Sequence, residues 1–218
     1  MALSKFNYNS FDVTPVASKA IGFNSDADGL TSISPTSMVL IKTLTASSSS
    51  TIDFVHGSSD VVLDSTYPIY LFKFINVQPG TDASKLEMNL SIDTGSNYNV
   101  TKTSSNFYAG HTEADGTGFG QDSGLAQSTA DAFITVGDIG SAADESCSGE
   151  MFLFSPSSTT FVKLFSSRCT INGSNPQAQI TYGSGYGNTT SAVDAVRFLM
   201  DSGNIASGTF KLYGIKDS

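Results

Sequence analysis

The chain contains two histidines, His56 and His111, and the tripeptide Asp122–Ser123–Gly124, which together include the residue types of a serine-hydrolase triad. A nucleophilic serine needs a histidine base that a third group orients beside an oxyanion hole. The sequence has no Gly-x-Ser-x-Gly elbow, and no motif surrounds His56. A polar turn in a glycine-rich segment accounts for Asp122–Gly124 without chemistry, so we predict no catalytic residue here.

Four carboxylates, Asp138, Asp144, Glu145 and Glu150, are candidates for glycoside hydrolysis, which uses two carboxyl groups that flank the scissile bond. None of them lies in the aromatic surroundings of a sugar cleft, and the chain has no tryptophan. We expect them to be surface carboxylates and the protein not to be an enzyme. A hydrolase acting on surface polysaccharide is the least favoured of three functions that the sequence leaves open.

The segment Asn24-x-Asp26-x-Asp28-Gly29 matches the first half of a calcium-binding loop. Such a loop of twelve residues closes on a bidentate glutamate, but Pro35 stands at that position. We therefore expect a turn at residues 24–29, and we predict neither a metal nor a cofactor.

Three tyrosines, Tyr98, Tyr182 and Tyr186, are the candidates for stacking on a sugar ring in a chain without tryptophan. Two of them belong to the glycine-rich segment 182–188. That composition suits an adaptable recognition loop, and it also suits a tight passage between strands. If the protein recognises a host surface glycan, these tyrosines are its predicted ligand-binding residues.

The formal net charge of the chain is -9, from 11 basic and 20 acidic residues. A surface of this sign repels phosphates and anionic lipids, so we expect neither nucleic-acid nor membrane binding. No apolar secretory segment is visible after Met1, which predicts synthesis and folding in a cytoplasm. Two cysteines, Cys147 and Cys169, are too few for a disulfide framework, and a reduced pair is favoured over a bridge.

From Met38 onward, apolar and polar residues alternate with a period of two, which indicates strands. Serine and threonine, about a quarter of the chain, suit strands and turns. Residues 85–93 alternate without a fault and predict a strand whose polar side faces water, whereas residues 67–77 predict a central strand. The other expected strands are 38–45, 50–56, 131–137, 148–155, 159–167, 177–183, 192–200 and 206–215.

Short turns between expected strands predict two hairpins, 148–155 with 159–167 and 192–200 with 206–215. Residues 106–130 hold five glycines and few apolar residues, and are expected to form a long loop for function or subunit contact. About ten strands at this spacing predict an all-β antiparallel sandwich over residues 36–218, with a jelly roll as the favoured type.

Residues 1–35 lack this alternation and are expected to form an irregular N-terminal arm. Its aromatic residues need something to pack on, either a partner or neighbouring subunit, or the arm's own sandwich. The predicted docking residues of the arm are Phe6, Tyr8, Phe11 and Phe23.

Several segments of the chain after about residue 36 resemble uncharacterised virion proteins encoded by marine and cyanobacterial tailed phages. The similarity spans most of that region and is specific in pattern, but it brings no catalytic motif. The segments that carry it are 99–105, which follows the alternating strand, Gly149–Lys163, Asn188–Phe198 and Ser202–Gly214.

The resemblance implies a non-enzymatic structural protein on the outer surface of a tailed bacteriophage virion, as a capsid decoration or a fibre component. By analogy with jelly rolls at such places it implies a homo-oligomer, with a trimer favoured. The arm would bind other virion proteins. The alternative function is a glycan-binding adhesin or receptor-binding tip that recognises a host surface glycan.

Overall fold

The computed structural model describes residues 20–23, 30–33, 37–122 and 124–216 of the chain. They belong to two units, one within residues 1–37 and a larger one that starts at Met38. The described residues contain no helix, and hence no helical segment that is long and apolar enough to cross a membrane. The larger unit consists of β3 (Met38–Ser49), β4 (Ile52–Val55), β5 (Ile69–Pro79), β6 (Leu86–Ser91), β7 (Lys102–Thr112), β8 (Thr117–Asp122), β9 (Ala132–Phe133), β10 (Cys147–Phe154), β11 (Lys163–Asn172), β12 (Gln177–Gly187), β13 (Ala195–Met200) and β14 (Ile205–Ile215).

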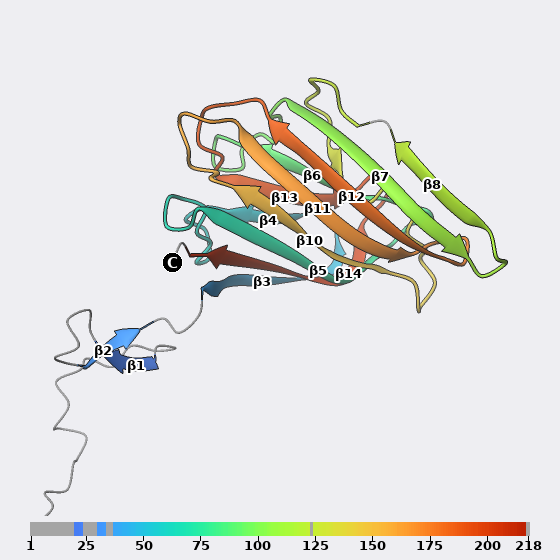
Figure 1. The fold of residues 1–218 in the computed structure, drawn as a ribbon, viewed down its shortest axis with the longest axis horizontal. Coiled ribbons are helices and arrows are strands. Elements are labelled where there is room, and N and C mark those ends of the chain that lie inside the picture. The colour runs from blue at the N-terminus through green and yellow to red at the C-terminus, as the bar shows by residue number, and fades with distance from the viewer. Residues whose placement is uncertain (1–19, 24–29, 34–36, 123, 217–218) are drawn as a thin grey trace, which may run out of the picture. The chain divides into compact units, whose positions relative to one another are not determined.

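Two antiparallel sheets build the larger unit (Figure 1). The large sheet has eight strands in the order β3-β14-β5-β10-β11-β12-β7-β8, and the small sheet has four in the order β4-β13-β6-β9. The predicted all-β antiparallel sandwich is thus confirmed, while the jelly-roll type stays a prediction. The expected central strand at 67–77 is β5, which pairs with β10 and β14.

Phenylalanines from both sheets meet in the core between them. Phe198 of β13 is fully buried, and its ring lies 5.0 to 6.3 Å from those of Phe54, Phe72, Phe74 and Phe210. Most of these rings meet edge to face, the arrangement that the aromatic quadrupole favours by about 0.5–1.5 kcal/mol per pair beyond burial. This cluster fixes β13 and β4 of the small sheet on β5 and β14 of the large one.

One of the two expected hairpins is confirmed and the other is wrong. β10 and β11 pair antiparallel along most of their length. β13 pairs with β4 and β6, however, whereas β14 pairs with β3 and β5, so the turn at 201–204 carries the chain from one sheet to the other. A short turn fits both arrangements, because alternation shows which side of a strand is buried and not which strand is its neighbour.

The long loop expected at 106–130 is also wrong, since most of β7 and all of β8 lie in this stretch and form a hairpin at one edge of the large sheet. Glycines hid the pattern. A Cβ atom at Gly120 would lie only 2.9 Å from the ring of Tyr108, so the glycine makes room for that ring across the hairpin. In β8, glycine stands where an apolar residue would otherwise face the sheet. The sequence therefore lacks the apolar–polar alternation that predicts a strand.

The expected exposure of the polar side of β6 is wrong as well. All six residues of this strand are buried, including Glu87, Asn89 and Ser91. β9 pairs with β6 within the small sheet, and the segment before β9 contacts the polar side of β6, where Asn89 Nδ2 donates to Asp131 Oδ1 at 2.7 Å. Period-two alternation predicted the strand, but it did not predict that the polar side of the strand is buried too.

The unit within residues 1–37 contains a two-stranded antiparallel sheet of β1 (Ala20–Phe23) and β2 (Leu30–Ile33). Phe23, one of the predicted docking residues, ends β1 opposite Leu30. The other predicted docking residues, Phe6, Tyr8 and Phe11, lie outside the described residues, as does the expected turn at 24–29.

The two cysteines are free and fully buried between the sheets. Cys147 begins β10, and Cys169 lies on β11 opposite Gly149. Burial raises the pKa of the Cys147 thiol and raises that of Cys169 to about 12. The thiols are therefore protonated at neutral pH and behave as small apolar core groups.

The buried Glu87 predicts a pH dependence of stability. Burial, and then the charges of Asp131 and Asp201, raise the pKa of Glu87 from its ordinary value of 4.5 to about 7. Because the folded protein holds this proton more tightly than the unfolded chain, the free energy of unfolding should fall as pH rises through that interval. Glu87→Gln, which cannot ionise, should remove this loss, on the order of 2 kcal/mol.

Urea unfolding of the wild type and Glu87→Gln at pH 4.5 and pH 8 measures this difference. Surface Glu113→Gln, at an exposed carboxyl, is the control and should follow the wild type. An equal pH dependence in the wild type and Glu87→Gln would contradict a raised pKa at Glu87.

Candidate functional site

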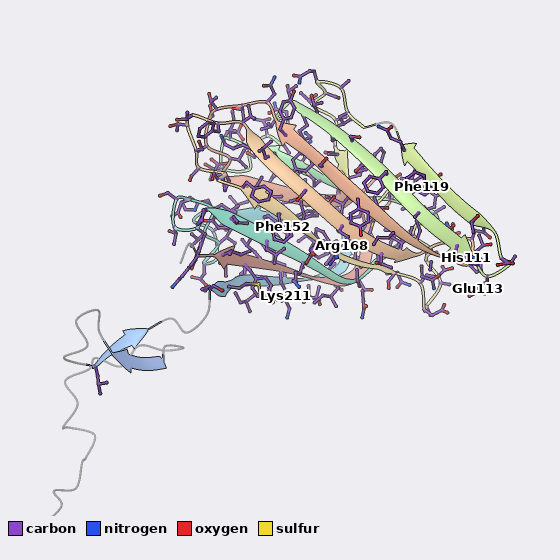
Figure 2. All side chains as sticks on the ribbon, in the orientation of Figure 1. His111, Glu113, Phe119, Phe152, Arg168 and Lys211 are labelled. Atoms are coloured by element: carbon purple, nitrogen blue, oxygen red, sulfur yellow. The ribbon has the colours of Figure 1, made fainter. Side chains whose placement is uncertain are left out.

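One row of outward-facing side chains crosses the large sheet. The register places Phe107 of β7 opposite Tyr182 of β12, Tyr182 opposite Arg168 of β11, and Arg168 opposite Glu150 of β10. The row continues from Glu150 to Lys73 of β5 and Lys211 of β14. Figure 2 shows Arg168 and Lys211 on this sheet, with Phe119 and Phe152 on either side of Arg168 along it. We call the surface that these strands expose the outer face of the large sheet.

The end of the row at β7 and β8 is aromatic. The rings of Phe107 and Tyr182 are stacked, with centroids 5.1 Å apart and 15° between their planes. Phe119 of β8 lies 6.3 Å from Phe107 and is 78% exposed. Large apolar side chains this exposed on neighbouring strands are typical of a binding surface rather than of a solvated sheet.

The middle of the row is charged. Glu150 accepts a hydrogen bond from Arg168 Nη2 at 3.0 Å, and its other oxygen lies 3.8 Å from Lys73 Nζ. With Lys211, the row holds three basic side chains and one carboxylate. In a chain of net charge -9, this makes the outer face locally basic and complementary to acidic groups.

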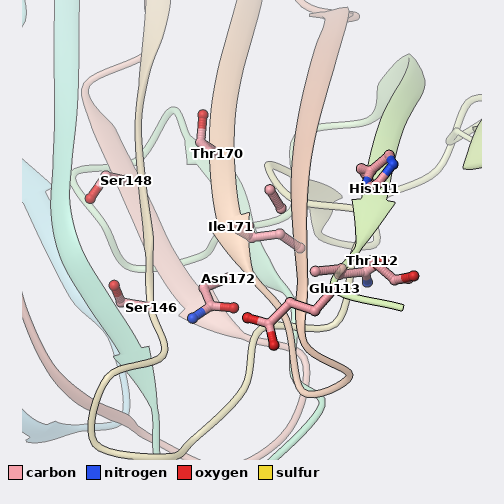
Figure 3. Close-up of a pocket in the computed structure, with 10 residues that line it drawn as sticks. His111, Thr112, Glu113, Ser146, Ser148, Thr170, Ile171 and Asn172 are labelled. Atoms are coloured by element: carbon pink, nitrogen blue, oxygen red, sulfur yellow. The ribbon is translucent and has the colours of Figure 1, made fainter. Parts of the chain in front are cut away.

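Two hollows lie on the outer face. One of about 330 Å³ adjoins the aromatic end and is lined by Phe107, Tyr182, Arg168 and Glu150 together with serines of β7, β11 and β12. The other, of about 580 Å³, lies near the ends of the strands (Figure 3). There the side chains of Glu113 and Asn172 point toward one another, with His111 on the neighbouring part of β7.

Beyond the charged residues, the outer face carries further exposed apolar side chains. The exposed fraction is 50% for Leu40 of β3 and 54% for Leu164 of β11. Phe152 and Phe154 of β10 stack on each other with 6.3 Å between centroids. Exposed apolar residues thus reach from one edge strand of the large sheet to the other.

The structure brings two of the three predicted ligand-binding tyrosines together. Tyr182 and Tyr186 both lie on β12 and not in a loop, and their even spacing points both to the outer face. The Tyr186 hydroxyl accepts a hydrogen bond from Gln127 Nε2 at 3.1 Å.

Tyr98 lies in the connection between β6 and β7, against Arg197 of the small sheet, and is not part of the outer face. Its ring covers the Arg197 guanidinium at 3.8 Å, and Arg197 in turn binds both carboxylate oxygens of Asp53. Burial, and then the charge of Asp53, raise the pKa of the Tyr98 hydroxyl to about 12. Tyr98 therefore closes over an ion pair and has a packing role.

Sequence reasoning missed Phe107, Phe119 and Arg168. The two phenylalanines lie in the stretch expected to be a loop, and Arg168 follows the end of the strand expected at 159–167. Phe119 stands alone between glycines, in Gly118-Phe119-Gly120, and Phe107 is followed by two further largely apolar residues. No apolar–polar alternation therefore marked this stretch as strands.

The two histidines considered for hydrolysis lie in separate places. His56 Nδ1 accepts a hydrogen bond from the Leu63 amide at 3.1 Å, which holds a loop. His111 lies 3.3 Å from Asp115 in the β7–β8 turn, and Ser123 is outside the described residues.

Three of the four carboxylates considered for glycoside hydrolysis have a different partner each. Glu145 accepts from the Ala142 amide, Asp138 lies 3.7 Å from Lys85, and Glu150 is in the charged row. Asp144 is exposed. Within the described part of the chain, no three histidine, cysteine or acidic residues are grouped so as to hold a metal ion.

Comparison with known proteins identifies no relative: no protein-family model, no curated protein and no solved structure matches the chain.

Proposed function

We propose that the protein is a non-enzymatic structural component of the outer surface of a tailed bacteriophage virion, as a capsid decoration or fibre component. The sequence resemblance supports the location, and the outer face of the large sheet supports a binding role. The observation that carries the proposal is the concentration of exposed aromatic and aliphatic side chains on this face. The N-terminal arm, residues 1–35, is the proposed contact with other virion proteins.

The proposed occupant of the outer face is another copy of the chain, with a trimer favoured. Eight strands spaced about 4.8 Å apart, each about ten residues long, present about 1,100 Å². A standard protein interface buries about 800 Å² on each partner, so the face is large enough for a stable oligomer. The spread of Leu40, Leu164 and Phe107 over the whole width also exceeds what one small ligand would cover.

A charge in the middle of this face should weaken assembly. Leu164→Lys leaves the fold intact because the residue is 54% exposed, but it buries an unpaired ammonium in the interface. We expect the dissociation constant of the oligomer to rise at least about tenfold, equivalent to about 1.4 kcal/mol. Size-exclusion chromatography with light scattering over a dilution series measures it.

Ile92→Lys is the matched control, since Ile92 is 42% exposed and follows β6 of the small sheet. It should assemble like the wild type. A wild-type chain that is monomeric at every concentration, or a Leu164→Lys variant that assembles like the control, would refute the proposed interface.

Immunogold electron microscopy of purified particles, with antibody against this chain, tests the location. Label scattered over the head is the expected result for a decoration protein, and label on the tail or fibres is the result for a fibre component. Particles without label would contradict the virion proposal.

A second candidate function is binding of a host surface glycan, and the hollow beside Phe107 and Tyr182 favours it. Aromatic rings beside hydroxyl, amide and charged groups are what a sugar needs for stacking and hydrogen bonding. For a sugar that the wild type binds on a glycan array, we expect the affinity of Tyr182→Ala to be at least about tenfold lower. Phe161→Ala, at an exposed ring between β10 and β11, is the control and should bind normally.

A further inference from the structure

A lysine, an asparagine and an aspartate meet at a buried place beside the crossing from β6 to β7. Lys102 begins β7 of the large sheet and is 0% exposed, while Asn89 on β6 of the small sheet is 3% exposed. Lys102 Nζ lies 2.5 Å from Asn89 Oδ1. On the other side of the same carboxamide, Asn89 Nδ2 donates to Asp131 Oδ1 at 2.7 Å.

The backbone holds the three residues in this arrangement. Residues 92–101 carry the chain from the small sheet to the large one, so Asn89 and Lys102 stand on either side of the crossing. Lys102 exchanges two backbone hydrogen bonds with Ser128, and Asn89 Nδ2 also donates to the carbonyl of Thr129 at 3.2 Å. The segment that contains Asp131 is thereby fixed over both side chains.

The surroundings raise the share of uncharged, nucleophilic amine at Lys102. Burial lowers the pKa of Lys102 from 10.5 to about 8, although the Asp131 carboxylate acts in the opposite direction. About a tenth of the side chain is then a free amine at pH 7, with a lone pair available for attack. The carbonyl of Val100, which accepts from Nζ at 2.8 Å, helps to orient it.

We propose that Lys102 and Asn89 join in an intramolecular isopeptide bond that the folded chain forms by itself. The amine Nζ attacks the carboxamide carbon Cγ of Asn89, and a bond forms between Nζ and Cγ. The Cγ–Nδ2 bond then breaks, its electron pair goes to Nδ2, and ammonia leaves. A primary amine and a carboxamide thus give a secondary amide and ammonia, with no oxidant, reductant or co-reactant.

Two neighbouring groups assist this reaction. The Leu90 amide donates to Asn89 Oδ1 at 2.8 Å, where negative charge develops in the tetrahedral intermediate, so it acts as an oxyanion donor. Asp131, in contact with Nδ2, takes the proton that Nζ loses and passes it to the departing nitrogen. Asp131 is therefore the catalytic acid and base of the proposed step.

A second buried lysine shows what the arrangement at Lys102 adds. Lys163 is also 0% exposed, but its ammonium donates to three backbone carbonyls, those of Ser158, Phe161 and Thr189. None of these is a carboxamide with a leaving nitrogen, and peptide carbonyls do not release ammonia. Burial of a lysine is common to both places, and only Lys102 faces an electrophile with a proton carrier behind it.

The mass of the intact, denatured full-length chain tests the proposal. We expect a mass below that of the sequence by one ammonia, about 17 Da. Lys102→Met, Asn89→Ala and Asp131→Asn should have the full mass of their own sequences, whereas the control Lys163→Met should still lack one ammonia. Asp131→Asn keeps the shape of the side chain and so tests the reaction even if Lys102→Met fails to fold.

Digestion locates the bond. Chymotrypsin cuts after Tyr98, between the two residues, and should release two peptides that stay joined through Asn89 and Lys102, while trypsin should fail to cut after Lys102. A wild-type chain at full mass would overturn the proposal. An ammonia loss that persists in Lys102→Met would overturn it as well. The loss would then have another source, such as a succinimide formed at Asn172–Gly173.

Discussion

The contact of Phe198 with rings of both sheets is the interaction on which the rest of the structure depends. It holds a sheet of four strands against a sheet of eight, and the two sheets are therefore unequal in width. The small sheet can cover only one side of the large one. The aromatic core thus leaves the other side of the large sheet, its outer face, outside the contact between the two sheets.

The same inequality explains where the polar side chains are buried. At the edge of the small sheet, the two-residue strand β9 pairs with β6, and the irregular segment before β9 contacts Asn89 of β6. This segment has few backbone hydrogen bonds to a neighbouring strand. Its buried polar groups are instead paired through side chains such as Asn89 and Asp131. The cluster of Lys102, Asn89 and Asp131 lies at this edge, where apolar packing gives way to a buried polar network.

The sequence predicted the class of fold because strands show either period-two alternation, as at residues 85–93, or an apolar run of strand length, as in β5. It failed where another residue type served the packing, as at Gly120, and where both sides of a strand are covered, as in β6. The outer face could be predicted only in part. Tyr182 and Tyr186 were found by residue type, but their neighbour Phe107 comes from a strand 75 residues earlier, and only the register brings it close.

The first and last strands of the sandwich are neighbours, with Met38 of β3 paired with Ile215 of β14. The chain therefore enters and leaves the sandwich at the same end of one ladder. Tension applied at these two points would load the hydrogen bonds of β3 and β14 one after another, like a zipper, and would not shear them all at once. Such a domain would unfold at low force if it were pulled through both of its termini. Its geometry suits an attachment through one terminus only.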